Sequence, residues 1–390
     1  MPTNPGGSTP GHDRRRNPPT IAMVSSGSPF DRRSWSGIPF YVHRELMRRY
    51  GAVHVIDTPA LDVLVNKLSR RLPVGLFLAR EPLVTAFYSR LVARRLAALR
   101  ADVVVSIGAP HKVVQLPPAW PVIHFEDADF ATIIDYYPIY QRISVRGRRI
   151  GCRLHRELLE RGAAVLVSSK WAARSAARHG DVPPSRFLVA PMGANLDEDP
   201  GPGSFRPSLG ALTLLFVGYD WNRKGGPLVL DTFAELKRRI GRVTLHVVGV
   251  TPENTRGVEG VIHHGVLRKS SPEERERLIE LFRTASFFFM PSRAEAFGLV
   301  YCEACAFGLP PVAADTGGVG EIIEHGVNGL LLPTSATASD YADAIQAVWS
   351  DGARYRAMQA HARQAFEKRL NWRAWGDVLD GAIRDQLQLV

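Results

Sequence analysis

Short apolar segments alternate with longer amphipathic segments along most of the chain. Each short segment is too brief for a helix and ends in Gly, Pro or polar residues, which is typical of buried parallel strands. In the first half the expected strands cover residues 20–26, 52–57, 102–108, 121–127, 164–169 and 186–193, and the expected helices 40–50, 83–100 and 170–180. This alternation predicts a doubly wound α/β domain.

The same alternation begins again after a segment rich in Pro, Gly and Ser at 197–211. Here the expected strands cover residues 212–218, 243–249, 260–265, 285–292, 310–315 and 329–333, and the expected helices 226–240, 272–285 and 298–308, before a helical region at 338–390. We therefore expect two Rossmann-like domains, 20–205 and 206–370. Ligands of parallel sheets bind outside the carboxyl ends of the strands, so facing domains place the site in the cleft between them.

The length of 390 residues suits two or three domains. Three cysteines are too few for a disulfide framework, which favours a reducing compartment. No apolar run approaches the roughly 18 residues that span a bilayer. Residues 1–19 are rich in Pro, Gly and Arg, lack the apolar core of a signal peptide, and are expected to form a disordered tail. A cytoplasmic protein is therefore expected.

The excess positive charge is confined to the first half. Residues 1–200 hold 28 Lys and Arg against 17 Asp and Glu, whereas residues 201–390 hold 21 of each kind. Segments 61–100 and 141–161 concentrate the basic residues, and in 61–100 they interleave with Leu, Phe and Val. This pattern fits either a solvated helix face or a face that binds the anionic inner surface of a membrane. Nucleic acid is not an expected partner, because no nucleic-acid-binding motif accompanies the charge.

The residues best suited to binding or catalysis follow the expected strand 285–292. A loop presents Glu295, and Gly298 and Leu299 then open a helix that carries Glu303. The N–H groups at a helix start form an anion site. Glu303 is suited to accept hydrogen bonds from a ribose diol, and Glu295 from the hydroxyls of a sugar. Two unrelated surface glutamates are the alternative for this pair taken alone.

With its neighbours, this segment resembles glycosyltransferase family 4, the large retaining family with the GT-B fold. The resemblance rests on Pro-Ser-x-x-Glu-x-Phe-Gly-Leu-x-x-x-Glu-Ala, followed in order by Gly-Leu-Pro, Gly-Gly-x-x-Glu-Ile-Ile and Gly-x-Asn-Gly-Leu-Leu. It implies a GT-B architecture of two facing Rossmann-like doubly wound domains, with the acceptor bound by the first and the nucleotide sugar by the second. It also implies a final helix, 371–390, that crosses back to the first domain.

Arg223 and Lys224, which follow Val217-Gly218, resemble the family's Arg/Lys pair. Two adjacent cations after a strand end can neutralise a diphosphate and the charge that develops on it as it leaves. Taken alone, such a dipeptide in a turn is usually solvated. The resemblance assigns Arg223, Lys224 and Glu295 to catalysis. The residues that it assigns to the donor are Glu303, Phe297, Gly298, Leu299, Gly218 and Gly37.

The first half contributes further candidates. Gly37 and Trp35 lie in the sequence Ser-Trp-Ser-Gly after the first expected strand, where the family has a Gly-rich loop. Trp35 is a candidate wall for the acceptor, with ordinary packing as the alternative. A later strand ends at Asp127, where the family carries a His or Asp near the reacting sugar. We choose Asp127 as the catalytic residue, with His124 and Asp129 as alternates on the acceptor side, although a strand-end Asp is also a common helix cap.

The resemblance implies a retaining hexosyltransferase that uses a UDP- or GDP-sugar and an acceptor hydroxyl on a lipid, a polysaccharide or a small metabolite. No metal or other cofactor is expected, because the two cations can replace a metal and no His/Cys pattern suggests one. Cys302 and Cys305 have redox-motif spacing but are expected to be buried helix residues. Two alternatives stay open, a catalytically silent nucleotide-sugar- or membrane-binding scaffold of the same fold, and a GT-B epimerase or phosphorylase.

Overall fold

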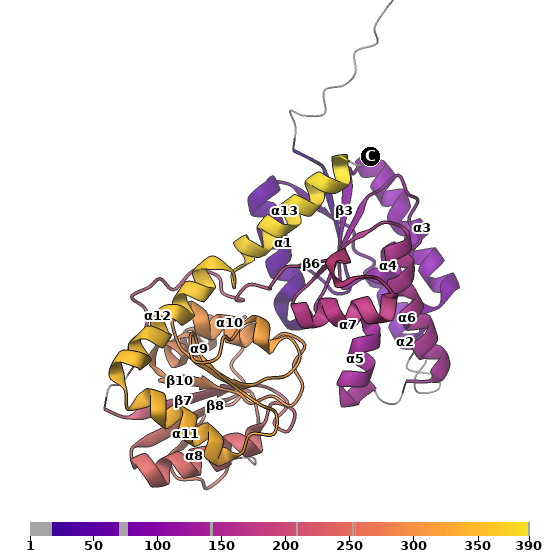
Figure 1. The fold of residues 1–390 in the computed structure, drawn as a ribbon. Helices are drawn as coiled ribbons and strands as arrows, with labels where there is room; N and C mark the ends of the chain where they lie inside the picture. Colours follow the sequence, from indigo (N-terminus) through magenta and orange to yellow (C-terminus); the bar gives the residue numbers. More distant parts are fainter. Residues whose placement is uncertain are drawn as a thin grey trace, which may run out of the picture.

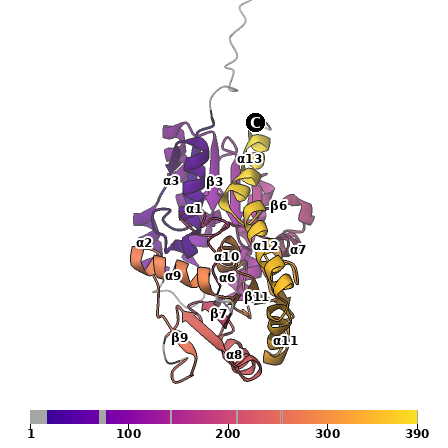
Figure 2. The same cartoon turned by 90° about the vertical axis from the view of Figure 1, so that its left-hand side faces the viewer.

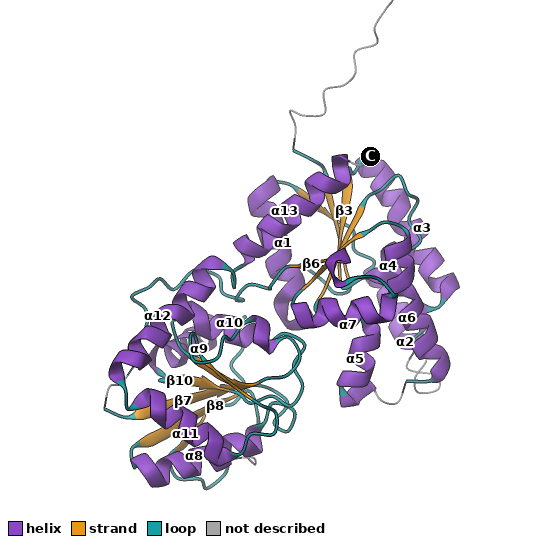
Figure 3. Ribbon diagram, in the orientation of Figure 1, coloured by secondary structure: helices purple, strands orange, loops and turns teal. Residues whose placement is uncertain are grey.

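Two six-stranded sheets form the framework of the protein (Figure 3). The computed structural model describes residues 18–69, 77–140, 143–207, 210–251, 253 and 255–388. Most of the expected tail and part of the basic segment 61–100 lie outside these ranges. Strand order is β2-β1-β3-β4-β5-β6 in the first sheet and β12-β11-β10-β7-β8-β9 in the second. Every strand pairing among the described residues is parallel, which confirms the predicted α/β class.

Each strand lies within a segment predicted as a strand. The first sheet contains β1 (Ile21–Ser25), β2 (Val53–Val55), β3 (Val103–Ile107), β4 (Val122–Glu126), β5 (Ala164–Val167) and β6 (Phe187–Val189). The second contains β7 (Leu212–Val217), β8 (Val243–Val248), β9 (Val261–His263), β10 (Phe287–Phe289), β11 (Pro311–Ala314) and β12 (Leu330–Leu332). The central strands are buried on both faces, which is why they appear as continuous apolar runs.

The helices cover both faces of each sheet (Figure 3). The N-terminal domain has α1 (Ile38–Tyr50), α2 (Pro59–Ser69), α3 (Pro82–Leu99), α4 (Pro110–Val113), α5 (Phe130–Tyr136), α6 (Val145–Glu160) and α7 (Lys170–Gly180). Then follow α8 (Gly226–Ile240), α9 (Pro272–Thr284), α10 (Leu299–Ala306), α11 (Ala338–Trp349), α12 (Gly352–Lys368) and α13 (Trp372–Gln388). Helices α2, α4, α5 and α6 were not predicted. The seven residues of α5 are too few to show a helical period.

Alternate residues of β1 pack in two different hydrophobic cores, one on each face of the first sheet. Ile21 and Met23 belong to the cluster that includes residues of α1 and α13, whereas Ala22 and Val24 pack in the cluster formed by α3 and α6. Successive side chains of a strand point to opposite faces, so one strand anchors both helix layers. The first cluster continues into the C-terminal domain, so the two domains share apolar packing around their connection.

Helix α13 follows the C-terminal domain in the chain but packs on the N-terminal one, beside α1 (Figures 1 and 2). Trp375 is fully buried, and its ring meets Phe125 of β4 edge-on at 5.3 Å. Arg49 of α1 lies 2.7 Å from Asp377 and also pairs with Asp380. Apolar burial and ion pairs together attach this helix to the first sheet.

Ion pairs fix the start of the Pro-, Gly- and Ser-rich segment 197–211, which connects the two domains. Asp197 accepts a hydrogen bond from Arg32 at 2.6 Å and lies 3.7 Å from Arg275 of α9, so it contacts both domains. Asp199 receives both terminal nitrogens of Arg363, at 2.6 and 2.7 Å. Arginines of both domains therefore hold the first residues of this connecting segment in place.

Trp375→Ala tests how strongly α13 stabilises the N-terminal domain. Truncating this buried ring should lower the free energy of unfolding by about 3–5 kcal/mol, through lost apolar burial and the cavity left behind. Urea denaturation followed by far-UV circular dichroism measures the change. The control is Leu83→Ala, whose side chain is 86% exposed and should change stability by less than about 0.5 kcal/mol. Equal effects of the two substitutions would contradict this role of α13.

Candidate active site

The candidate residues gather where the carboxyl ends of the two sheets face each other. Glu295 lies in the loop between β10 and α10, and Arg223 and Lys224 lie in the loop between β7 and α8. Strands β7 and β10 are neighbours in the sheet, so these two loops emerge side by side. Asp127 follows β4 of the opposite domain. Parallel topology thus brings together residues that are far apart in the sequence.

Glu295 is buried and meets both predicted cations. Lys224 Nζ donates a hydrogen bond to Glu295 Oε2, and Arg223 Nη1 lies 3.7 Å from the same oxygen. Arg223 also donates to the carbonyl oxygen of Ala294 at 3.0 Å, which fixes its guanidinium against the Glu295 loop. A buried carboxylate needs a compensating cation, and here two cations from the neighbouring loop supply it.

A glycine permits the close approach of these two loops. Gly225 has φ of 78° and immediately precedes α8. A β-carbon at this position would lie 2.1 Å from the carbonyl oxygen of Pro291, in the segment that leads to Glu295. Any larger residue would therefore separate the cationic loop from the loop of Glu295.

The carboxylate of Glu303, on α10, pairs with Lys269, a residue that the sequence did not identify as part of the site. Lys269, in the loop after β9, donates to Glu303 Oε1 and also to the carbonyl oxygen of Asn195 at 3.3 Å. The side chain of Glu303 is only 5% exposed and that of Lys269 is 32% exposed, so Lys269 covers the carboxylate. Nothing in the local sequence around Lys269 signals this contact, because 34 positions separate the pair.

The start of α10 has the geometry expected for an anion site. Gly298 adopts φ of 99° and precedes Leu299, the first helical residue. A β-carbon on Gly298 would lie 2.5 Å from the Tyr301 ring, so the turn depends on glycine. The first N–H groups of a helix have no partner within the helix. Phe297 is buried beneath this turn, and Gly218 is buried at the end of β7 beside Lys224.

The loop after β1 is strained and is held by the connection between the domains. Trp35 and Ser36 have φ of 41° and 55°, values that non-glycine residues rarely adopt, and Gly37 follows at 85°. Asn195 Nδ2 donates to the carbonyl oxygen of Ser36 at 2.6 Å, and Asn195 Oδ1 accepts from Trp372 Nε1 at 3.0 Å. One buried side chain thus fixes both the strained loop and the start of α13.

Trp35 itself packs on the N-terminal domain. A β-carbon at Gly108, after β3, would lie 2.7 Å from the Trp35 ring, so the indole rests directly on that backbone. The ring is half-buried and therefore keeps an exposed part beside the loop of Gly37. Packing and a wall for the acceptor are thus both compatible with its position.

Asp127 is the candidate whose ionisation the fold perturbs most clearly. Burial raises the pKa of Asp127 to about 7, and the negative charges of Glu126 and Glu295 add to the effect. The influence of Glu295 crosses from one domain to the other. The N–H of Ala128 donates to Asp127 Oδ1 at 2.9 Å and partly opposes the rise.

The structure does not bring the alternates His124 and Asp129 into the cleft. His124 is fully buried, 3.0 Å from Ser106 Oγ and 3.2 Å from Glu126 Oε2. Asp129 is also fully buried and accepts hydrogen bonds from the N–H groups of Ala131 and Thr132 at the start of α5. His124 is therefore a residue of the sheet interior and Asp129 a helix cap, which corrects both assignments.

The Cys302 and Cys305 side chains are fully buried in α10, and burial raises the pKa of both thiols.

Within the described ranges, no three or more His, Cys, Asp or Glu side chains are grouped to hold a metal ion. Nor does this part of the chain contain a helix both long and apolar enough to cross a membrane.

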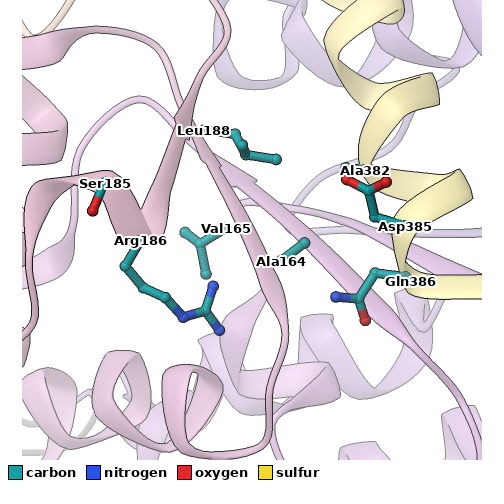
Figure 4. A pocket seen from close by; sticks show the side chains of 8 residues that line it. All are labelled: Ala164, Val165, Ser185, Arg186, Leu188, Ala382, Asp385 and Gln386. Atoms are coloured by element: carbon teal, nitrogen blue, oxygen red, sulfur yellow. The ribbon is translucent and has the colours of Figure 1, made fainter. Parts of the chain in front are cut away.

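A separate pocket lies away from the cleft. Its lining comes from the amino ends of β5 and β6 and from α13 (Figure 4). The residues that line it are Ala164, Val165, Ser185, Arg186, Leu188, Ala382, Asp385 and Gln386. Since the candidate residues lie at the carboxyl ends of the strands, this pocket is not part of the candidate site.

The family match falls on the C-terminal domain of the chain. Residues 204–365 match the family model described as glycosyl transferases group 1. The D-inositol 3-phosphate glycosyltransferase of Rhodococcus jostii is 31% identical over 222 residues, which are 53% of this chain and 48% of that protein. The enzyme of the same name from Geodermatophilus obscurus is 37% identical over 210 residues, 49% of this chain and 46% of that protein. The aligned region spans about half the length of these relatives.

Solved structures resemble the whole fold. A glycosyltransferase from Rickettsia africae aligns with a TM-score of 0.69 and 15% identity, covering 95% of this chain and 99% of that one. HepE of Anabaena, solved in complex with UDP, aligns with a TM-score of 0.63 and 18% identity, covering 95% of this chain and all of that one. These similarities confirm the GT-B architecture. The C-terminal domain of the chain, over residues 204–365, is similar to the group 1 glycosyltransferases.

Proposed function

We propose that this protein transfers a sugar from a nucleotide-diphosphate donor to an acceptor hydroxyl, with retention of anomeric configuration. The observation that carries the proposal is the meeting of Glu295 with Arg223 and Lys224, beside the start of α10. A carboxylate that can hold sugar hydroxyls thus lies next to two cations and a helix start that can hold a diphosphate. The two halves of a nucleotide sugar have matching partners in one place.

The two cations support departure of the nucleotide diphosphate. As the bond between the sugar carbon and the phosphate oxygen breaks, negative charge grows on the diphosphate and the sugar becomes oxocarbenium-like. Arg223, Lys224 and the N–H groups at the start of α10 stabilise that charge electrostatically as it develops. These groups supply the electrostatic stabilisation that a metal ion supplies in other transferases, so we propose that transfer needs no added metal.

Retention follows when the acceptor attacks the face from which the diphosphate departs. The acceptor oxygen forms the new bond to the sugar carbon, and its proton passes to the departing phosphate oxygen. The products are a glycoside and a nucleoside diphosphate. No protein nucleophile is needed, so the carboxylate pair of a retaining hydrolase is not part of the proposal.

The nucleoside is assigned to the second domain. In this assignment Glu303 accepts hydrogen bonds from the ribose hydroxyls. Lys269, which covers this carboxylate, then moves aside or shares it with the ligand. We propose UDP as the nucleotide, because a protein of similar fold was solved in complex with UDP. GDP remains the second choice to be tested.

Donor turnover in the presence of EDTA tests the central proposal. Glu295→Gln should lower kcat about ten- to hundredfold by weakening hydrogen bonds to the sugar, and Lys224→Ala about 10²–10³-fold by removing charge stabilisation. Release of nucleoside diphosphate from UDP- and GDP-sugars is the measurement. Glu259→Gln, an exposed glutamate, is the control and should behave as the native protein.

Three results would contradict the proposal. One is full loss of turnover with EDTA that added metal restores. Another is native turnover in both site variants. The third is a native protein that binds UDP in a thermal-shift assay but turns over no donor with a broad panel of acceptors, which would favour a silent scaffold.

Asp127 makes transfer dependent on pH. Because burial raises its pKa to about 7, the carboxyl is mostly protonated at pH 6 and mostly ionised at pH 8. If the ionised form orients the acceptor hydroxyl, kcat/KM should rise about tenfold per pH unit below pH 7 and level off above it. Asp127→Asn should remove the slope, whereas Asp135→Asn, on the exposed face of α5, should keep it. An unchanged slope in Asp127→Asn would exclude this role.

We also propose that the N-terminal domain binds an anionic membrane surface. Leu83, Phe87, Arg90 and Arg94 follow one stripe of α3, and all four are exposed. Val63, Leu64, Lys67 and Leu68 form a similar exposed stripe on α2. The 3₁₀ helix Leu78–Arg80 contacts α2, α3 and α6, so these elements form one side of the domain (Figure 1). Apolar side chains beside arginines are suited to the interface of anionic lipids.

Sedimentation with vesicles tests this surface. Native protein should bind phosphatidylserine-containing vesicles, bind phosphatidylcholine vesicles less, and lose binding as salt rises. The double variant Leu83→Asp/Phe87→Ser should bind at least about tenfold more weakly, through lost apolar burial and added repulsion. Val258→Asp, at an exposed site of the C-terminal domain, controls for the added charge. Absence of binding even at low salt would contradict the proposal.

A further inference from the structure

Two adjacent tyrosines of the N-terminal domain hold the loop of Glu295 in the other domain. The N–H of Glu295 donates to the hydroxyl of Tyr136 at 2.8 Å. The N–H of Ala296, the next residue, donates to the hydroxyl of Tyr137, also at 2.8 Å. Both tyrosines are at the end of α5, so one short helix contacts two consecutive peptide groups across the domain boundary.

Further contacts surround this pair. The Tyr136 hydroxyl lies 2.6 Å from Thr316 Oγ1, after β11. A β-carbon on Gly317 would lie 2.7 Å from the same hydroxyl, so the approach of Tyr136 depends on a glycine. The guanidinium of Arg223 lies 5.5 Å from the centre of the Tyr137 ring. The tyrosine pair therefore touches the loops of Glu295, Arg223 and Thr316.

A second helix of the N-terminal domain docks beside α5. The N–H of Lys170, the first residue of α7, donates to Glu321 Oε2 at 3.0 Å. A carboxylate at a helix start is favoured by the helix dipole. Glu321 belongs to the same segment as Thr316 and Gly317, so α5 and α7 hold the C-terminal domain at two adjacent points.

The loop of Glu295 depends on these contacts for its position. It connects β10, which ends at Phe289, to α10, which begins at Leu299, without regular structure of its own. Buried backbone N–H groups need acceptors. Those of Glu295 and Ala296 find theirs in the opposite domain, so separating the domains would take the acceptors away.

We propose that Tyr136 and Tyr137 are positioning residues, which place Glu295 for the donor sugar only when the two domains are closed on each other. This inference rests on the proposed function. Helix α5 begins three residues after Asp127, with Asp129 capping its start, and its end holds Glu295. A single rigid helix thus connects the acceptor side of the cleft with the sugar side, and closure prepares both together.

Removal of the hydroxyls tests the inference with little change of shape. Tyr136→Phe and Tyr137→Phe should each lower kcat about fivefold, and the double variant about 20- to 50-fold, as expected for loss of one and two hydrogen bonds. Affinity for UDP, measured by calorimetry, should stay within about twofold, because the nucleotide is assigned to the C-terminal domain. The radius of gyration from X-ray scattering with UDP present should increase in the double variant.

Two further variants separate positioning from general stability. Tyr50→Phe removes a tyrosine hydroxyl that bonds Asp380 within the N-terminal domain, away from the cleft, and should leave kcat and the radius of gyration unchanged. Thr316→Val removes a partner of Tyr136 from the opposite domain and should lower kcat less in the Tyr136→Phe background than in the native protein.

The outcomes distinguish failure of this inference from failure of the proposed function. Native kcat and an unchanged radius of gyration in the double variant would overturn the inference while transfer stands. A parallel fall of kcat, UDP affinity and melting temperature would also overturn it, because it indicates general destabilisation. If the native protein transfers no sugar, the proposed function fails, and an unchanged radius of gyration would then still show that the tyrosines do not hold the domains.

Discussion

Two carboxylates remain buried in the cleft because a lysine neutralises each of them. Lys224 pairs with Glu295, and Lys269 pairs with Glu303. Burial of an uncompensated charge costs several kcal/mol, so the loops that carry these lysines must stay against the loop and helix that carry the glutamates. The order of strands in the second sheet meets this requirement for Glu295 by placing β7 beside β10.

The connection between the domains carries a second constraint. Trp35 and Ser36 adopt strained backbone angles, which cost on the order of 1–3 kcal/mol each and persist only where surrounding contacts enforce them. Asn195 supplies one such contact, and its own carbonyl oxygen accepts from Lys269. The strained loop of the first domain and the lysine over Glu303 in the second therefore share a single residue. Movement at this connection necessarily alters the surroundings of both.

Much of the fold was predictable, because strands buried on both faces appear as uninterrupted apolar runs. The loop of Glu295 and the helix of Glu303 were predictable from residue types at fixed spacing. Alternation in β4 places His124 on the face opposite Ile123 and Phe125, which pack in the core that includes residues of α1 and α13. Lys269 and Tyr136 could not be assigned, because their contacts depend on how separate loops and domains meet. The residues next to Lys269 and Tyr136 in the sequence give no indication of these contacts.

The position of α13 determines the order in which the protein can be completed during synthesis. The first sheet is translated early, yet the surface around Phe125 that Trp375 covers stays open until the whole second domain has been made. Domains made on the ribosome generally fold as units, in order of their emergence. Here the second domain can assemble before the first is finished. The nascent first domain therefore exposes an apolar surface for most of translation, and a chaperone that binds such surfaces would find its substrate there.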